Sequence, residues 1–181
     1  MSMFGTLLSI ASPIRCALLF LLLAAASILG ALGFQHIGGY QPCALCLMQR
    51  TPYYIGMPLA ALTLAALAFR APRGLVLVLF AGLALLALYN AGLGAYHSGI
   101  EWDFWKGPES CAPSGDPLGG DLGENILEKL KSEVAPSCTE AVWRFLGLSF
   151  AGWNVLVSLF LAALALAGLN GMRETADQTA A

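Results

Sequence analysis

Hydrophobic residues dominate four long stretches of the chain, and polar segments separate these stretches. The stretches cover residues 16–34, 52–69, 74–96 and 145–169. A helix needs roughly 20 apolar residues to cross the hydrocarbon core of a bilayer, so each stretch has about the required length. A backbone inside lipid must satisfy its own hydrogen bonds, and the first two connectors are too short for strand pairing. The pattern therefore predicts an all-α membrane protein, built as a bundle of four transmembrane helices.

The polar segments differ in length and character. They cover residues 35–51, 70–73 and 97–144, and the last is long, acidic and rich in Gly, Pro and Ser. We expect residues 1–171 to form one membrane domain and residues 172–181 to form a flexible tail.

The long third segment contains a helical pattern of its own. Apolar residues are spaced by four from Leu122 to Val134, which predicts a short amphipathic helix before Pro136. This helix either lies flat on the membrane surface or covers the end of the bundle, and the sequence favours neither position.

Composition agrees with a membrane protein. Hydrophobic side chains make up 58% of the chain and charged ones 11%, and the mean hydropathy is +0.73. These values lie far outside the averages of soluble globular domains, so a lipid bilayer is the expected surrounding. The formal net charge is -2 and no basic cluster occurs, which argues against a nucleic-acid partner.

Four of the five cysteines lie in the first and third polar segments. Two spans separate these segments, so both emerge on the same face of the membrane. The cysteines that share this face are Cys43, Cys46, Cys111 and Cys138. Persistent cysteine pairs belong to oxidising compartments such as the bacterial periplasm, which would leave both termini in the cytoplasm. Cys16, at the opposite end of the first span, is expected to be a buried, inert thiol.

Cys43 and Cys46 form a C-x-x-C pair at the start of the second span. Thiols at a helix start often have a lowered pKa, which makes them redox-active rather than merely structural. If the helix begins near Pro42, Arg50 lies one turn past Cys46 on the same face, where its charge can stabilise a thiolate. The alternative role of Arg50 is that of an interfacial anchor.

The four cysteines on one face also allow a zinc site. Against this, Cys111 and Cys138 are far apart in a flexible segment and do not form a second compact C-x-x-C pair. Such a pair is more typical of an exposed disulfide, so no metal is expected. Two disulfides on one face suggest a relay in which electrons pass from soluble thiols to the loop pair and then to the C-x-x-C pair.

A lipid-soluble quinone is the expected electron acceptor, because the surroundings of Cys46 are apolar. A quinone ring needs a flat hydrophobic slot, and its carbonyl oxygens need hydrogen-bond donors such as Arg50 or a histidine. His97, at the outer end of the third span, is a candidate for the second donor. Its alternative role is that of a solvated residue at the membrane interface.

Two other classes of function fit parts of the sequence. A haem-carrying electron-transfer protein would use His36 and His97, the two histidines, as axial ligands, but this leaves the cysteines unexplained. A non-catalytic scaffold or transporter with disulfide-stapled loops is expected to carry several charges or paired polar groups within its spans. These spans contain almost none.

Three segments together resemble one known family. They are PCALCLMQR at residues 42–50, YHSGIEWDFWKGPESC at residues 96–111 and CTEAVWRFLGLSFAGWN at residues 138–154. With four spans around them, these segments make nearly the whole chain similar to the bacterial disulfide-bond-formation protein B (DsbB) family. The resemblance implies a multi-pass enzyme of the bacterial inner membrane, a protein-dithiol:quinone oxidoreductase. Such an enzyme reoxidises a periplasmic DsbA-like thiol oxidase and hands the electrons to ubiquinone or menaquinone.

The same resemblance implies a role for each candidate residue. Cys111 would form the mixed disulfide with the partner, and Cys138 would exchange with Cys43. Cys46 would face the quinone beside Arg50. His97 would be the polar residue that the family places near the quinone.

Overall fold

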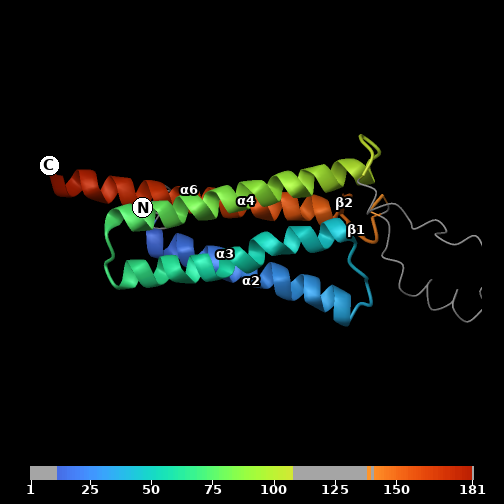
Figure 1. Ribbon diagram of the computed structural model, residues 1–181, viewed down its shortest axis with the longest axis horizontal. Coiled ribbons are helices and arrows are strands. Elements are labelled where there is room, and N and C mark those ends of the chain that lie inside the picture. Colours follow the sequence, from blue (N-terminus) through green and yellow to red (C-terminus); the bar gives the residue numbers. More distant parts are fainter. Residues whose placement is uncertain (1–11, 108–137, 140, 181) are drawn as a thin grey trace, which may run out of the picture.

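The computed structural model describes residues 12–107, 138, 139 and 141–180. Within this part of the chain, four long helices form a bundle and a short hairpin precedes the last of them (Figure 1). The elements are α2 (Pro13–His36), α3 (Ala44–Ala68), α4 (Arg73–Glu101), β1 (Arg144–Phe145), β2 (Leu148–Ser149) and α6 (Phe150–Ala180). All four helices are long and apolar enough to cross a membrane, α6 over Phe150–Met172. The predicted four-helix membrane bundle is confirmed.

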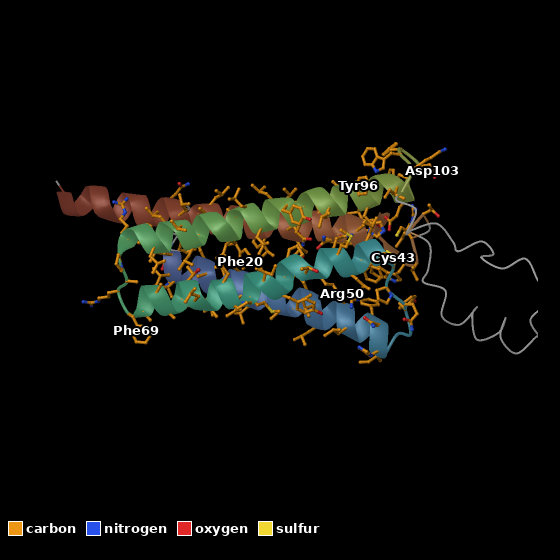
Figure 2. The ribbon with its side chains drawn as sticks, in the orientation of Figure 1. Phe20, Cys43, Arg50, Phe69, Tyr96 and Asp103 are labelled. Carbon is orange, nitrogen blue, oxygen red and sulfur yellow. The ribbon has the colours of Figure 1, made fainter. Side chains whose placement is uncertain are left out.

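The helices form a ring in which α3 packs against α2 and α4, and α6 packs against the same two helices. The connector from α2 to α3, the end of α4 and the hairpin lie at one end of the bundle (Figure 1). The tight turn that joins α3 to α4 lies at the opposite end, where Phe69 is found (Figure 2). Cys43 and Cys138 share one buried cluster at the first end, which agrees with the expectation from the parity of the spans.

The start of α3 differs from the hydrophobic pattern. The apolar stretch begins at Pro52, whereas the helix begins at Ala44 and includes Cys46 and Arg50. The cause is a cap that hydropathy does not reveal, because the Cys43 sulfur accepts the backbone N–H of Cys46 at 3.3 Å. The C-x-x-C spacing therefore places the two sulfur atoms at the N-cap and the third position of one helix.

The last helix is also longer than its apolar stretch. Residues after Gly171 are expected from the sequence to form a flexible tail, but α6 continues to Ala180. Most residues from Met172 onward are good helix formers, and no proline or glycine interrupts them, so the helix propagates. The predicted amphipathic helix of the long loop and Cys111 lie outside the described residues.

A two-residue hairpin precedes α6 where the sequence predicts the start of a span. Arg144 pairs with Ser149 and Phe145 with Leu148 in antiparallel register. The two turn residues between them have φ values of 52° and 83°, which is the geometry of a tight hairpin turn. Ser149 then caps α6, because its Oγ accepts the backbone N–H of Gly152 at 3.2 Å. The hairpin thereby brings a serine hydroxyl to the end of α4.

A glycine allows α4 and α6 to approach closely. A Cβ atom at Gly94 would lie 2.9 Å from Cγ2 of Val155 and 3.2 Å from the carbonyl oxygen of Ala151. The backbone carbonyl cannot move aside without moving α6, so Gly94→Ala is expected to destabilise the bundle by about 1–3 kcal/mol. Thermal unfolding in detergent measures the effect. Gly92 is exposed on the same helix with nothing within 4 Å of its Cβ position, so equal losses in Gly92→Ala and Gly94→Ala would contradict this packing.

Candidate functional site

The C-x-x-C pair is present as two thiols. The sulfur atoms of Cys43 and Cys46 lie 3.0 Å apart, which is hydrogen-bonding distance and well beyond the roughly 2.05 Å of a disulfide bond. Both cysteines are free. Cys43 is 4% exposed, whereas Cys46 is partly exposed. The two sulfurs therefore have different surroundings although they are nearly in contact.

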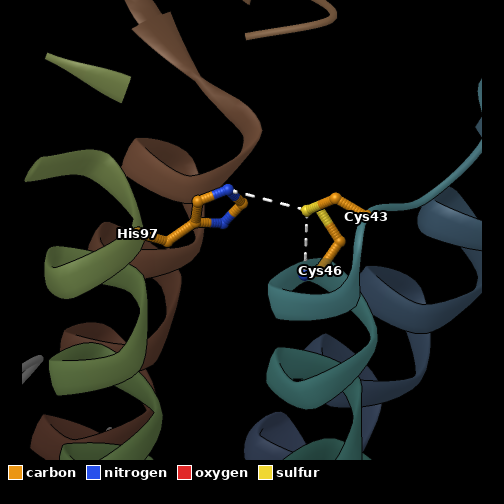
Figure 3. Close-up of side chains that lie close together, drawn as sticks. All are labelled: Cys43, Cys46 and His97. Carbon is orange, nitrogen blue, oxygen red and sulfur yellow. Dashed lines mark hydrogen bonds between the residues drawn. The ribbon is translucent and has the colours of Figure 1, made fainter. Parts of the chain in front are cut away.

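His97 approaches the pair from α4, across the bundle. Its Nε2 atom lies 3.7 Å from the Cys43 sulfur (Figure 3). The other ring nitrogen, Nδ1, lies 2.8 Å from the side-chain nitrogen of Gln49 on α3. With only 3% of its surface exposed, His97 is a buried histidine with a side-chain partner at each nitrogen.

The surroundings of Cys43 favour its thiolate form. The hydrogen bond from the Cys46 thiol is the largest cause, and the hydrogen bond from His97 and the backbone N–H of Cys46 add to it. Burial opposes these effects but does not outweigh them, so the pKa of Cys43 falls from 9.0 to about 4. At neutral pH Cys43 is consequently the ionised member of the pair.

A carboxylate lies behind His97. Oε1 of Glu101 is 3.8 Å from His97 Nε2, and the Glu101 side chain is 5% exposed. The hydroxyl of Ser149, on the hairpin, donates a short hydrogen bond to the other carboxylate oxygen. Because Ser149 also caps α6, the hairpin and two helices hold this carboxylate in place.

Buried amides extend the polar cluster into the bundle. Asn154 on α6 donates to Oε1 of Gln49 at 2.7 Å and accepts the hydroxyl of Tyr53 at 2.7 Å. The Asn90 amide nitrogen lies 3.4 Å from the same Asn154 oxygen and donates to Ser158 at 3.0 Å. These side chains connect α3, α4 and α6 in the interior of the bundle.

A cavity of about 300 Å³ is lined by Cys46 but not by Cys43. Its walls come from α2, α3, α6 and the connector after α2, and they are mainly apolar. The apolar lining includes Ile28, Phe34, Tyr53, Phe150 and Val157, and the polar lining includes Cys46, Gln49, Arg50 and Asn154. An apolar cavity with a few converging polar groups is the usual form of a small-molecule site.

Arg50 lies on the cavity wall one helical turn after Cys46. Its guanidinium donates a 2.6 Å hydrogen bond to the side-chain oxygen of Gln35, at the end of α2. A guanidinium has five N–H donors, so this bond fixes its position while other donors can serve an oxygen atom in the cavity. The sequence predicted the shared face of Cys46 and Arg50, and both residues line one cavity.

Cys138 is held close to the pair. It is 1% exposed, it belongs to a disulfide bond, and it packs in one apolar cluster with Cys43, Leu45 and Ile100. A disulfide-bonded Cys138 does not fit a zinc site built from four thiolates. Cys16 lies apart from this cluster, buried in the main core of the bundle.

Comparison with known proteins identifies the family of the chain. The model of the family described as Disulfide bond formation protein DsbB matches residues 13–168, which is most of the chain. The chain belongs to the DsbB family. Three relatives that carry the name Disulfide bond formation protein B illustrate the similarity. The protein of Polaromonas sp. is 30% identical over 88% of this chain and 90% of its own length. The protein of Methylococcus capsulatus is 32% identical over 88% and 95%, and that of Verminephrobacter eiseniae is 32% identical over 91% and 93%.

Membership of the DsbB family makes this chain a multi-pass bacterial membrane oxidoreductase that functions in disulfide formation. His97, which the sequence assigned to a quinone site, contacts Cys43 and Gln49 and is not among the residues that line the cavity. Because side chains engage both of its ring nitrogens, the geometry does not favour the alternative in which His97 ligates haem iron.

Several polar residues of the site were not predicted. They are Gln35, Gln49, Tyr53, Asn90, Glu101, Ser149 and Asn154. One signal was present in the sequence, because Asn90 and Asn154 are amides inside otherwise apolar spans, where polar residues are costly and often functional. Their connection to Gln49 depends on the register of three helices, which the hydrophobic pattern does not specify.

Proposed function

We propose that this DsbB-family protein reoxidises a periplasmic DsbA-like thiol oxidase and passes the electrons to a membrane quinone, either ubiquinone or menaquinone. The observation that carries the proposal is the position of Cys46. Its side chain lines an apolar cavity together with Arg50, and its partner Cys43 packs in one apolar cluster with the disulfide-bonded Cys138. A sulfur pair that both lines an apolar cavity and packs beside a disulfide-bonded cysteine suits electron transfer between the two.

The cavity has the properties that a quinone head group requires. Its apolar walls suit a flat ring, and Arg50 provides N–H groups for carbonyl oxygens. A bound quinone supplies a two-electron acceptor that becomes a quinol when it also takes up two protons. The chain itself provides the reductant, the ring slot and the donors.

The proposed sequence has three balanced exchanges. First, the two thiols of the partner reduce the Cys111–Cys138 disulfide and become a disulfide themselves. Second, Cys111 and Cys138 reduce the Cys43–Cys46 disulfide, with Cys43 as the sulfur that exchanges with Cys138. Third, Cys43 and Cys46 form their disulfide again, and two electrons and two protons pass from the site to the quinone. The free thiols of Cys43 and Cys46 correspond to the reduced pair before the third exchange.

The proposal also specifies the side of the membrane on which the cysteines lie. Both cysteine pairs are assigned to the periplasmic end of the bundle, so the two termini would be cytoplasmic in a bacterial inner membrane. Cys43 lies at the end opposite to the tight turn after α3 (Figure 2), and Cys46 and Cys138 pack in the same cluster, which supports a single compartment for the thiol chemistry.

Reconstitution of the full chain tests this function. Purified protein in lipid nanodiscs is supplied with a reduced DsbA-like protein and, in parallel, with ubiquinone or menaquinone. One quinol is expected for each partner disulfide formed. A protein that staples its own loops but transfers no electrons would give neither product, and that result would contradict the proposal.

Arg50 is expected to support the use of the quinone rather than the formation of disulfides. Arg50→Ala removes a donor from the cavity wall, so the KM for quinone should rise about tenfold or more, since hydrogen bonds to charged groups contribute about 1.5–3 kcal/mol. Mapping of free and paired cysteines should still show the disulfide of Cys138. Arg70→Ala, in the exposed turn at the far end of the bundle, is the matched control. An unchanged KM in Arg50→Ala would remove Arg50 from the site.

A further inference from the structure

The buried amides form a chain of hydrogen bonds with one direction. Tyr53 donates to Oδ1 of Asn154, and the Asn154 amide nitrogen donates to Oε1 of Gln49. The Gln49 amide nitrogen then faces Nδ1 of His97 at 2.8 Å. An amide nitrogen has hydrogens and no acceptor site, so Nδ1 must be the acceptor in this contact.

A backbone carbonyl fixes the orientation of Gln49. The same amide nitrogen lies 3.4 Å from the carbonyl oxygen of Leu45, one turn earlier in α3. A carbonyl oxygen can only accept, so turning the amide over would place two oxygen atoms against each other there. It would also break the bond from Asn154, whose amide oxygen accepts from Tyr53. Gln49 is therefore held with its N–H groups toward His97.

The direction of these bonds decides where His97 carries its proton. A neutral imidazole has one N–H, and an Nδ1 that accepts from Gln49 leaves the proton on Nε2. Nε2 is the atom that lies 3.7 Å from the Cys43 sulfur. His97 in this tautomer is a hydrogen-bond donor toward Cys43.

We propose that Gln49 is a positioning residue that holds His97 in the Nε2–H tautomer, so that His97 donates a hydrogen bond to the Cys43 sulfur and does not accept its proton. This role rests on the proposed function, in which Cys43 is the sulfur that exchanges with Cys138. A donor at Cys43 stabilises the thiolate that forms when Cys43 leaves a disulfide and that attacks when it enters one.

Glu101 favours a hydrogen on the same ring nitrogen. Its carboxylate oxygen lies 3.8 Å from Nε2, so an N–H on this atom has an acceptor there as well as at the Cys43 sulfur. A proton on Nδ1, however, would meet the N–H groups of Gln49 at 2.8 Å. A hydrogen on Nδ1 therefore requires that Gln49 turns over and loses its bonds to Leu45 and Asn154.

The tautomer also has a consequence for metal binding. The ligand atoms of Cys43, Cys46 and His97 lie within 4.8 Å of one another, as thiophilic metals require. A metal takes the lone pair of the nitrogen that faces it, but in this tautomer Nε2 carries a hydrogen. Histidine ligands normally donate their other N–H to an acceptor, and Gln49 presents a donor instead. Gln49 thus protects the thiol pair from metal ions.

Nitrogen NMR of the His97 ring tests the tautomer directly. Protein labelled with nitrogen-15 histidine is measured in nanodiscs with Cys43 and Cys46 reduced, and His36→Asn removes the signal of the other, exposed histidine. Near neutral pH, we expect Nδ1 to have the nitrogen-15 chemical shift of an unprotonated ring nitrogen and Nε2 to have that of a protonated one. A protonated Nδ1 in the otherwise unchanged protein would overturn the proposal.

Substitution of Gln49 tests whether this residue sets the tautomer of His97. Gln49→Glu keeps the shape but offers only acceptors, so the Nδ1 signal is expected to become protonated. Cadmium, followed by its thiolate charge-transfer absorbance, should then bind about 10- to 100-fold more tightly. Gln49→Met, which has no donor, is expected to give a mixture of tautomers. Asn170→Asp adds the same charge on an exposed part of α6 and should match the unsubstituted protein.

The outcomes separate this role from the proposed function. If Gln49→Glu changes neither the nitrogen chemical shifts of His97 nor the affinity for cadmium, the role of Gln49 is contradicted. Neither measurement involves a quinone, so a protein with the expected tautomer that reduces no quinone would overturn the proposed function alone.

Discussion

Replacing Cys46 with serine is expected to abolish electron transfer to a quinone while the disulfide bond of Cys138 still forms. Cys46 is the member of the C-x-x-C pair that lines the cavity. A serine hydroxyl cannot form a disulfide with Cys43, so in the proposed function the two electrons from the partner have no route to the acceptor. The measurement is the yield of quinol and of partner disulfide, with free and paired cysteines mapped by mass spectrometry.

Cys16→Ala provides the control for this experiment. Cys16 is buried in the main core of the bundle, apart from the cluster that contains Cys43 and Cys138. Its replacement should leave the ratio of quinol to partner disulfide unchanged. Continued quinone-dependent oxidation by Cys46→Ser would show that another group reduces the acceptor, and the assignment of Cys46 would be wrong.

The hydrophobic pattern was sufficient to predict the bundle. A membrane requires about 20 apolar residues for each helix and allows no unpaired backbone in lipid, so four apolar stretches leave few alternatives. The same pattern could not locate the start of α3, because the helix begins with a sulfur cap at Cys43 in a polar segment. Hydropathy indicates which residues can lie in the membrane, whereas the start of a helix depends on its capping residue.

The chemistry of the site was predicted in part. The spacing of Cys46 and Arg50 on one helix is enough to place both on one face, and the cavity confirms that they share a surface. The contact of His97 with Gln49 joins two helices, so it depends on their relative rotation and depth. Sequence spacing contains no information about that rotation, so it did not predict the contact of His97 with Cys43.

The hydrogen bond between Ser149 and Glu101 could not be predicted from the sequence pattern for a different reason. It depends on a hairpin whose turn residues, Leu146 and Gly147, lack the Asn-Gly or Asp-Gly signature of such turns. The apolar residues on either side of the turn made this segment similar to the start of a span. The hydrophobic pattern therefore does not predict this hairpin, and only the backbone structure reveals it.

The reactivity of Cys43 is expected to stay constant as the pH falls from about 8 to about 6. Its pKa is lowered to about 4, so its thiolate persists at every pH above that value and is lost only when the pH approaches it. A thiol with the ordinary pKa of 9.0 would be ionised to about one part in a thousand at pH 6, so the difference there is roughly a thousandfold. The rate of alkylation by iodoacetamide, resolved for each cysteine by mass spectrometry, measures this.

Two variants of Cys46 separate the causes of the low pKa. The titratable groups that face Cys43 are Cys46 and His97, with Glu101 behind His97. Cys46→Ser keeps an O–H donor to the Cys43 sulfur and should preserve most of the effect, whereas Cys46→Ala removes the largest cause and should move the pKa back toward 9.0. A rate that rises tenfold for each pH unit in the unsubstituted protein would mean that Cys43 is an ordinary thiol. The donors at its sulfur would then not hold the negative charge that the proposed exchange with Cys138 requires.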